Sequence, residues 1–220
     1  MKRAIALGTF DGVHIGHRAI INAAIDKAAE LDMEPMIYTF TAHPMALFGK
    51  QPPLLMTQSE RMAALGGMGC ALSADEFSAE YAATEPEQFI KMLIERLDMG
   101  CAVAGFNYTF GRRGDGSVEL IKKLGEKYGF AVEIVPPVMY KGEAVSSTRI
   151  RACLEAGRVK DAGEMLGTPY SITGPIIRNR GIGRTLDYPT ANIAGWEDRA
   201  VPMALSLIHI SEPTRLRCIS

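Results

Sequence analysis

The first two thirds of the chain alternate short apolar runs with longer amphipathic segments. Apolar runs of strand length occur at residues 4–8, 35–40, 101–105 and 131–135. Segments of helix length separate these runs, and this alternation is typical of a parallel sheet covered by helices. We therefore expect the chain to begin with an α/β domain built on a parallel sheet.

The longer segments have apolar positions at helical spacing. In residues 17–31, one face of the expected helix carries Ile20, Ala24, Ala28 and Leu31. In residues 84–97, the corresponding face carries Phe89, Leu93 and Leu97. Thr84 followed by Glu87 predicts a capping box at the start of this second helix. Further helices are expected over residues 117–128 and from the segment "SSTRIR" at 146–151.

The pattern changes after "LGTPY" at residues 166–170. The residues that follow contain short apolar runs, glycines and prolines without helical periodicity, which favours short strands joined by loops. We therefore expect one domain over residues 1–167 and part of a second, β-rich domain over residues 168–202.

The overall charge is nearly balanced, with 24 Lys and Arg residues against 25 Asp and Glu residues. A balanced charge offers no broad electrostatic field to a nucleic acid or a membrane surface, so we expect neither as a partner. The four cysteines show no metal-ligand spacing and fit a reducing compartment. Because no apolar run is long enough for a signal sequence or a membrane span, we expect a cytoplasmic protein.

The segment "GTFDGVHIGH" at residues 8–17 directly follows the first apolar run. A strand, a glycine-containing turn and a helix N-terminus bring backbone N–H groups to one point, and such groups attract phosphate. His14 and His17 lie three positions apart, so both imidazoles can face one anion, and Gly16 leaves the approach open. The sequence therefore predicts a triphosphate site at this turn.

This segment resembles the HxGH phosphate-binding motif of nucleotidyltransferases, in the form found in prokaryotic bifunctional FAD synthetases. Three further segments resemble that family in the same order: "TFTAHP" at 39–44, "GFNYTFGRRGD" at 105–115 and "VSSTRIR" at 145–151. The segment "GRTLDYPTAN" at 183–192 resembles the start of the riboflavin kinase module in the same proteins. Agreement of several ordered motifs makes the resemblance specific.

The resemblance implies a Rossmann-like nucleotidyltransferase domain over residues 1–167, followed by an incomplete β-barrel fragment of a riboflavin kinase over residues 168–202. It implies transfer of AMP from ATP to FMN, which yields FAD and pyrophosphate, with riboflavin as the substrate of the kinase module. No attacking side chain is needed, because the FMN phosphate has a second pKa of about 6 and is largely dianionic at pH 7. The resemblance also implies Mg²⁺, bound mainly through the ATP phosphates.

Site residues follow from the resemblance, position by position. The expected catalytic residues are His14, His17, Ser147, Thr148 and Arg151. The expected ATP-binding residues are Gly8, Phe10, Asp11, Gly16, Asn107 and Ser146. The candidate flavin-binding residues, some of which could instead belong to the core, are Phe40, His43, Phe106 and Tyr108. Arg149 and Arg151 lie near a helix N-terminus, where basic side chains are unfavourable, so we expect a bound anion beside them.

The kinase module has fewer matching positions. The residues that the resemblance assigns to its nucleotide and metal are Gly183, Thr190 and Asn192. Asp187 and Tyr188 stand where the family pattern has Gly and Phe. Residues 203–220 match nothing in that pattern, so we interpret them as a non-native tail and expect riboflavin phosphorylation to be lost.

Two other functions are open from the sequence. The phosphate motifs alone would fit another HxGH nucleotidyltransferase, acting on pantetheine phosphate, nicotinate mononucleotide or a cytidylyl acceptor. The chain could also bind a nucleotide or a flavin without turnover. The "PTAN" segment at residues 189–192 favours flavin synthesis, because an adenylyltransferase joined to a riboflavin kinase combines two consecutive steps.

Overall fold

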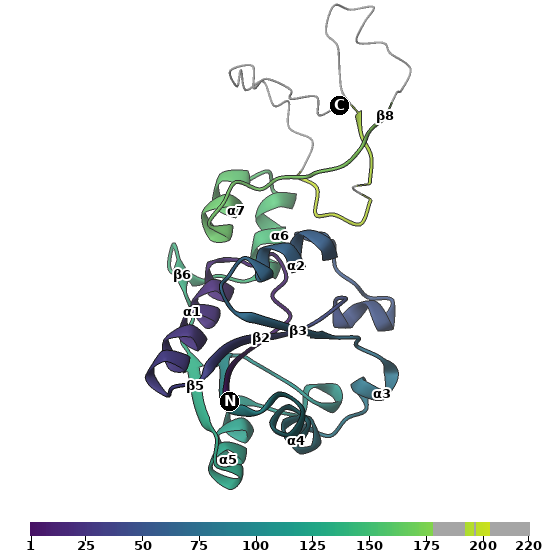
Figure 1. Ribbon diagram of the computed structural model, residues 1–220. Coiled ribbons are helices and arrows are strands. Elements are labelled where there is room, and N and C mark those ends of the chain that lie inside the picture. The colour runs from purple at the N-terminus through teal and green to yellow at the C-terminus, as the bar shows by residue number, and fades with distance from the viewer. Residues whose placement is uncertain (178–191, 196, 203–220) are drawn as a thin grey trace, which may run out of the picture.

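Five parallel strands form the centre of the computed structural model, which describes residues 1–177, 192–195 and 197–202 (Figure 1). The order across the sheet is β3-β2-β1-β4-β5. The strands are β1 (Arg3–Leu7), β2 (Glu34–Phe40), β3 (Ala71–Asp75), β4 (Met99–Gly105) and β5 (Ala131–Val135). Every pairing in this sheet is parallel, which confirms the expected α/β fold and the four strands predicted from apolar runs.

The edge strand β3 is the strand that the hydrophobic pattern does not predict. Its residues, "ALSAD", include one large apolar side chain, and the strand is exposed or half-buried along its whole length. Strand propensity depends strongly on context, and an edge strand can form with few apolar residues. The strand conformation of these residues is therefore stabilised mainly by pairing with β2 and less by their composition.

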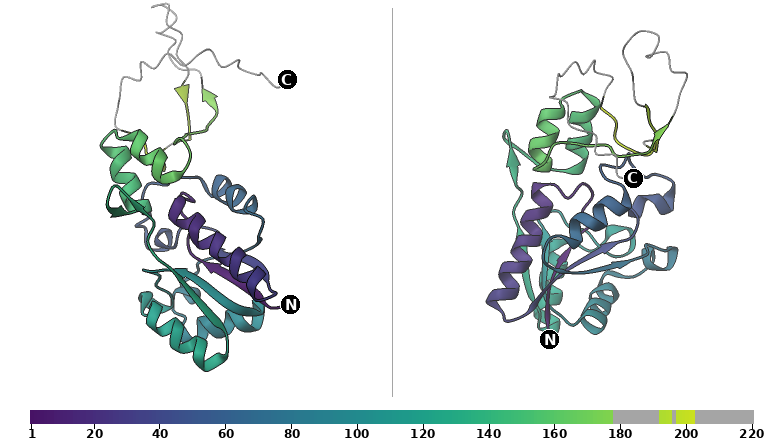
Figure 2. Two further views of the ribbon diagram at one scale, coloured as in Figure 1. Left: turned by 90° about the vertical axis from the view of Figure 1, so that its left-hand side faces the viewer. Right: turned by 45° about the horizontal axis from the view of Figure 1, so that its top comes forward.

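Helices cover both faces of the sheet, and Figure 2 shows α1 in purple on the opposite face from α5 in teal. The helices are α1 (Ile15–Glu30), α2 (Gln58–Gly66), α3 (Ala79–Ala82), α4 (Pro86–Leu97), α5 (Val118–Tyr128), α6 (Ser147–Glu155) and α7 (Val159–Leu166). Ala4 and Ala6 of β1 pack in one core cluster with α1, while Ile5 and Leu7 pack in a second cluster with α4 and α5. Successive side chains of a strand point to opposite faces, so one short apolar run supplies both layers.

The apolar stripe expected on α4 is buried at Phe89, Leu93 and Leu97. The stripe expected on α1 is shorter than predicted, because Leu31 is the C-cap residue and is 37% exposed. Asp32, which follows, has a left-handed φ of 53°, a conformation that commonly ends a helix. The helix therefore stops one residue before the last position of the predicted stripe.

The capping box predicted at Thr84 and Glu87 is wrong. The N-cap of α4 is Glu85, and Pro86 occupies the first helical position. The residue before a proline avoids the helical region, so the helix cannot begin earlier. The structure instead has a capping box at the start of α2, where the Glu60 N–H donates to Thr57 Oγ1 at 3.2 Å and the Thr57 N–H donates to Glu60 Oε2 at 2.8 Å.

The residues after α7 return to the first domain beside α2. The Leu54 N–H donates to the Asp198 carbonyl at 2.7 Å, and the Ala200 N–H donates to the Leu54 carbonyl at 2.9 Å. The short strands β8 (Ile176–Ile177) and β9 (Asn192–Ile193) pair antiparallel, as expected of a β-rich segment. The predictions for the kinase module concern residues outside the described part of the chain, namely Gly183, Asp187, Tyr188, Thr190 and residues 203–220, and the side chain of Asn192 also lies outside it.

Candidate functional site

Backbone conformation and lack of space for a side chain explain the glycines in the turn between β1 and α1. Gly12 has a φ of 80°, and a Cβ there would lie 2.7 Å from Leu55 Cδ1. A Cβ on Gly16 would lie 3.2 Å from the His14 ring. Phe10 also has a positive φ, of 51°, although it is not glycine. Backbone strain of this kind persists where the surrounding structure enforces it and is frequent at functional sites.

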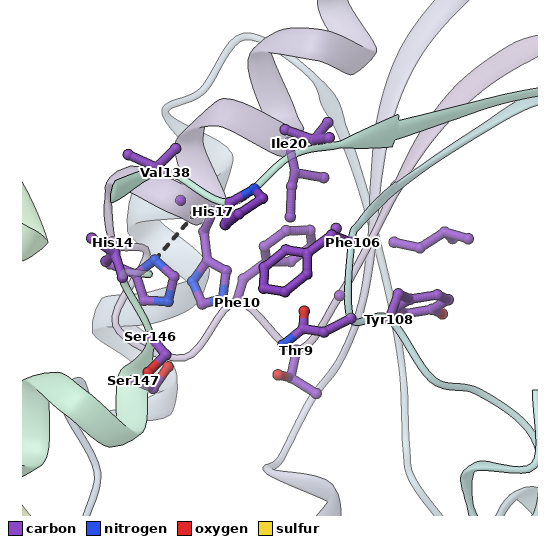
Figure 3. Close-up of a pocket in the computed structure, with 18 of the residues that line it drawn as sticks. Thr9, Phe10, His14, His17, Ile20, Phe106, Tyr108, Val138, Ser146 and Ser147 are labelled. Carbon is purple, nitrogen blue, oxygen red and sulfur yellow. Dashed lines mark hydrogen bonds between the residues drawn. The ribbon is translucent and has the colours of Figure 1, made fainter. Parts of the chain in front are cut away.

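His14 and His17 lie face to face at the N-terminus of α1 (Figure 3). Their ring centroids are 3.5 Å apart with an angle of 16° between the planes. The Nδ1 atom of His14, the N-cap residue, accepts a hydrogen bond of 3.2 Å from the His17 backbone N–H. An uncharged His14 ring therefore carries its proton on Nε2, which leaves that N–H free to donate to a ligand.

Burial keeps both imidazoles uncharged. It lowers the pKa of His14 to about 4, because the residue is only 5% exposed. Burial is also the main cause that lowers the pKa of His17 well below its ordinary value, and His14 and Arg61 lower it further by charge repulsion. At neutral pH the two rings therefore act as hydrogen-bond donors or acceptors without a charge of their own.

We expect the free energy of unfolding to fall as the pH drops from 6.5 to 4. In this window the unfolded histidines, with a pKa near 6.5, bind protons that the buried His14 does not bind, so protonation favours the unfolded chain. The limiting slope is about 1.4 kcal/mol per pH unit for each such histidine. Urea unfolding of the parent and of His14→Gln at pH 7 and pH 5 measures it. An equal pH dependence in both proteins would contradict the expectation.

The N-terminus of α6, far along the sequence, contacts the turn between β1 and α1. Ser146 is the N-cap of α6, and its Oγ accepts from the Arg149 N–H at 3.2 Å. Ser147 Oγ donates to the Asp11 carbonyl at 2.9 Å, which joins α6 directly to the glycine-containing turn. Two helix N-termini thus converge, and each presents backbone N–H groups and a partial positive charge to an anion.

A cavity of about 370 Å³, here called the histidine cavity, opens between these two N-termini (Figure 3). It lies beyond the carboxyl ends of β1, β4 and β5, where open parallel sheets usually bind ligands. Its walls include these residues singled out from the sequence: Gly8, Phe10, His14, Gly16, His17, Phe106, Asn107, Tyr108, Ser146, Ser147 and Thr148. The structure adds Val135, Pro136, Pro137 and Val138, whose only signal in the sequence is a pair of prolines that ends an apolar run.

Asp11 and Arg151 lie beside the histidine cavity and do not line it. Their side chains form a buried ion pair, only 7% and 10% exposed, and Arg151 Nε also donates to the Pro53 carbonyl at 2.5 Å. Arg149 pairs with Glu143 at 3.1 Å. Protein carboxylates thus compensate the two arginines near this helix N-terminus, so the reason for expecting an anion beside them no longer holds.

A second cavity of about 470 Å³, here called the aromatic cavity, adjoins the first. Of the candidate flavin residues it contains Phe40, His43 and Tyr108, whereas Phe106 lines only the histidine cavity. The structure adds Phe77 and Tyr81, whose rings lie 5.0 Å and 5.2 Å from that of Phe40 in edge-to-face contacts. The residues that line both cavities are Gly8, Thr9, Tyr108 and Thr109.

None of the helices in the described part of the chain is long and apolar enough to cross a membrane. Within the same ranges, no three His, Cys, Asp or Glu side chains are grouped so that they could hold a metal ion. The polar side chains that line the histidine cavity belong to His, Ser, Thr, Tyr and Asn residues, whereas the aromatic cavity also has the charged side chain of Arg113 in its wall.

Comparison with known proteins gives two adjoining family matches. The family model for FAD synthetase matches residues 1–149, which contain both cavities. The family model for riboflavin kinase matches residues 166–209, and so runs past the boundary expected at Pro202.

Proteins described as bifunctional riboflavin kinase/FMN adenylyltransferase are similar along most of the chain. The protein from Listeria monocytogenes is 32% identical over 92% of this chain, and that from Bacillus subtilis is 36% identical over 87%. The chain spans only 65% and 62% of the length of these two relatives. A crystal structure of a Streptococcus pneumoniae protein, described as a macrolide-efflux protein, matches with 31% identity and a TM-score of 0.81 over 91% of this chain and 66% of that one. With its motifs, its sheet and two thirds of its residues matched to one family model, the chain belongs to the FAD synthetase family.

Proposed function

We propose that residues 1–167 form an FMN adenylyltransferase, which transfers AMP from ATP to FMN, and that residues 168–202 belong to a riboflavin kinase module. The observation that carries the first proposal is the pair of adjoining cavities. One lies at two helix N-termini and suits a polyphosphate, and the other is lined by rings that suit a flavin. Because Thr9 and Tyr108 line both, a phosphate attached to a flavin in one cavity can reach a nucleotide in the other.

In the proposed reaction, an oxygen of the FMN phosphate attacks the α-phosphorus of ATP. The new P–O bond completes FAD, the bond from the α-phosphorus to the oxygen bridging to the β-phosphate breaks, and pyrophosphate leaves with that electron pair. The FMN phosphate is largely dianionic at pH 7, so no side chain has to remove a proton from it. The protein then has to align the two phosphates and stabilise the charge that spreads over them.

We assign the stabilising hydrogen bonds to His14, His17, Ser147 and Thr148. The convergence of their segments on the histidine cavity supports this assignment, and so does the free Nε2–H of an uncharged His14. Gly8, Gly16, Asn107 and Ser146 are proposed neighbours of ATP in the same cavity. Mg²⁺ is proposed to bind through phosphate oxygens, which are the ligands it commonly uses in such reactions.

We place the isoalloxazine ring in the aromatic cavity, beside Phe40 and Tyr108. The edge-to-face cluster of Phe40, Phe77 and Tyr81 supports this position, because such rings bury large apolar area without hydrogen-bond demands. Phe106 is proposed to contact the adenosine part of ATP, since it lines the histidine cavity and the residue is 46% exposed.

The proposed function is tested by incubating the protein with ATP, Mg²⁺ and FMN. We expect FAD and pyrophosphate in equal amounts. Replacing FMN by pantetheine phosphate or nicotinate mononucleotide should give no adenylylated product, which separates this function from that of other nucleotidyltransferases. Binding of FMN and ATP without any FAD would show that the chain is a binding module and would overturn the proposal.

Phe40→Ala is expected to raise the KM for FMN about tenfold, because the loss of one stacked ring in a binding site costs on the order of 1 kcal/mol or more. The KM for ATP should change less than about threefold. Phe106→Ala is the matched control, a ring of the same kind in the neighbouring cavity, and should raise the KM for ATP instead. A rise in the KM for FMN in Phe106→Ala alone would mean that the two cavities have been assigned in the wrong order.

A further inference from the structure

A buried guanidinium group lies near both cavities and lines neither. Arg61 of α2 is 7% exposed. No carboxylate in the described ranges of the chain lies within ion-pair distance of it. Burying a charge without a partner of opposite sign costs folding free energy unless hydrogen bonds satisfy the charged group. The guanidinium group of Arg61 therefore has to be satisfied by hydrogen-bond acceptors around it.

The acceptors of Arg61 come from the ends of two neighbouring strands. Nη1 donates to the Thr9 carbonyl at 2.9 Å and to Thr39 Oγ1 at 3.0 Å. Nη2 donates to the Phe40 carbonyl at 2.6 Å and to the Thr41 carbonyl at 3.0 Å. Thr39 Oγ1 itself donates to the Thr9 carbonyl at 3.3 Å. The planar guanidinium thus joins the turn after β1 to the end of β2 with a fixed geometry, which a lysine could not reproduce.

The turn after β1 and the end of β2 contribute to the two cavities in different ways. Thr9 lines both, whereas Phe40, the last residue of β2, and His43, which follows the strand, line the aromatic cavity and not the histidine cavity. Arg61 therefore fixes the positions of two parts of the aromatic cavity wall, at Thr9 and at Phe40, relative to each other. Of the four residues that accept hydrogen bonds from Arg61, only Thr9 lines the histidine cavity.

We propose that Arg61 is a positioning residue for the flavin: it sets the width of the aromatic cavity by joining the turn at Thr9 to the segment from Phe40 to Thr41. This inference rests on the proposed function, in which FMN occupies that cavity. The charge of Arg61 also contributes to lowering the pKa of His43, which lines the aromatic cavity, and of His17, which lines the histidine cavity.

The alternative is that Arg61 only stabilises the fold. A purely structural role predicts that its loss weakens FMN and ATP binding equally, or neither. A positioning role predicts a selective loss of FMN binding, because only the aromatic cavity has Arg61 bonds on two sides. The ratio of the two affinities therefore separates the two roles.

The test uses Arg61→Met, Arg61→Lys and Thr39→Val, with the dissociation constants of FMN and ATP titrated separately and with circular dichroism as the check of folding. We expect Arg61→Met to weaken FMN binding about tenfold to a hundredfold, as small displacements in a binding site do, and ATP binding less than about threefold. Arg61→Lys, which keeps the charge, should recover part of the FMN affinity. Thr39→Val keeps the side-chain volume but removes one acceptor of Arg61, so it should weaken FMN binding in the same direction.

Arg3→Met is the matched control, because Arg3 also donates to a carbonyl group, that of Leu97, but lies at the opposite end of β1. It should leave both affinities unchanged. Unchanged FMN affinity in folded Arg61→Met and Thr39→Val, or equal losses for FMN and ATP, would overturn the proposal. If Arg61→Met does not fold, the losses of FMN and ATP affinity are compared in Arg61→Lys and Thr39→Val instead. A parent that binds FMN but forms no FAD would refute the proposed function and leave this comparison valid, whereas a parent that binds no FMN would overturn both.

Discussion

His17→Ala is expected to lower the rate of FAD formation by about 10² to 10³, the usual effect of removing one well-placed donor to developing charge. The residue lies at the first turn of α1, lines the histidine cavity and stacks on His14 at 3.5 Å. Its buried Nδ1 atom has no hydrogen-bond partner among the described residues, so its removal leaves no protein group there unpaired. The measurement is the initial rate of FAD formation at saturating ATP and FMN.

The fold should survive this change, and circular dichroism and the urea midpoint monitor it. Asn22→Ala is a suitable control, since Asn22 is exposed on the same helix and lines neither cavity. Full turnover in a folded His17→Ala variant would show that His17 does not contact the reacting phosphates. A loss of rate in Asn22→Ala of similar size would point to α1 as a whole rather than to the imidazole.

Asp11→Ala is expected to lower the free energy of unfolding by about 3–5 kcal/mol, because it leaves the Arg151 guanidinium buried without its carboxylate. The two side chains are only 7% and 10% exposed, so water cannot replace the lost partner. The pair also joins the turn after β1 to α6, so the histidine cavity should lose its shape together with stability. Urea unfolding at pH 7, with the slope compared between variants, gives the change.

A surface ion pair of the same helix provides the control. Glu143→Ala removes the partner of Arg149, but the Glu143 side chain is 74% exposed, so the loss should stay below about 1 kcal/mol. The double variant Asp11→Leu with Arg151→Met should recover much of the stability lost in Asp11→Ala, because two apolar side chains leave no buried charge. Equal effects of Asp11→Ala and Glu143→Ala would contradict the buried pair.

The sequence by itself determined the elements whose pattern is local. Four apolar runs predicted β1, β2, β4 and β5. The central strands β1, β2 and β4 are largely buried and are therefore apolar almost throughout, whereas β5 is an apolar strand at the edge of the sheet, exposed or half-buried along its length. The order of a short strand, a glycine-containing turn and a helix predicted where anion-binding N–H groups gather. His14 and His17 could be selected for the same reason, because their spacing places both on the first turn of one helix.

Only the tertiary structure decided which partner each side chain has. The sequence predicts Arg151 as a phosphate-binding residue, and only the structure pairs its side chain with Asp11, 140 residues away in sequence. The division of Phe40 and Phe106 between two cavities depends on the ends of different strands, β2 and β4, with β1 between them. Arg61 gave no signal in the sequence, because its four acceptors are mostly backbone carbonyl groups that every residue carries. Periodicity reports which face of an element is buried, whereas ion pairs, cavity walls and backbone acceptors depend on how elements distant in sequence meet.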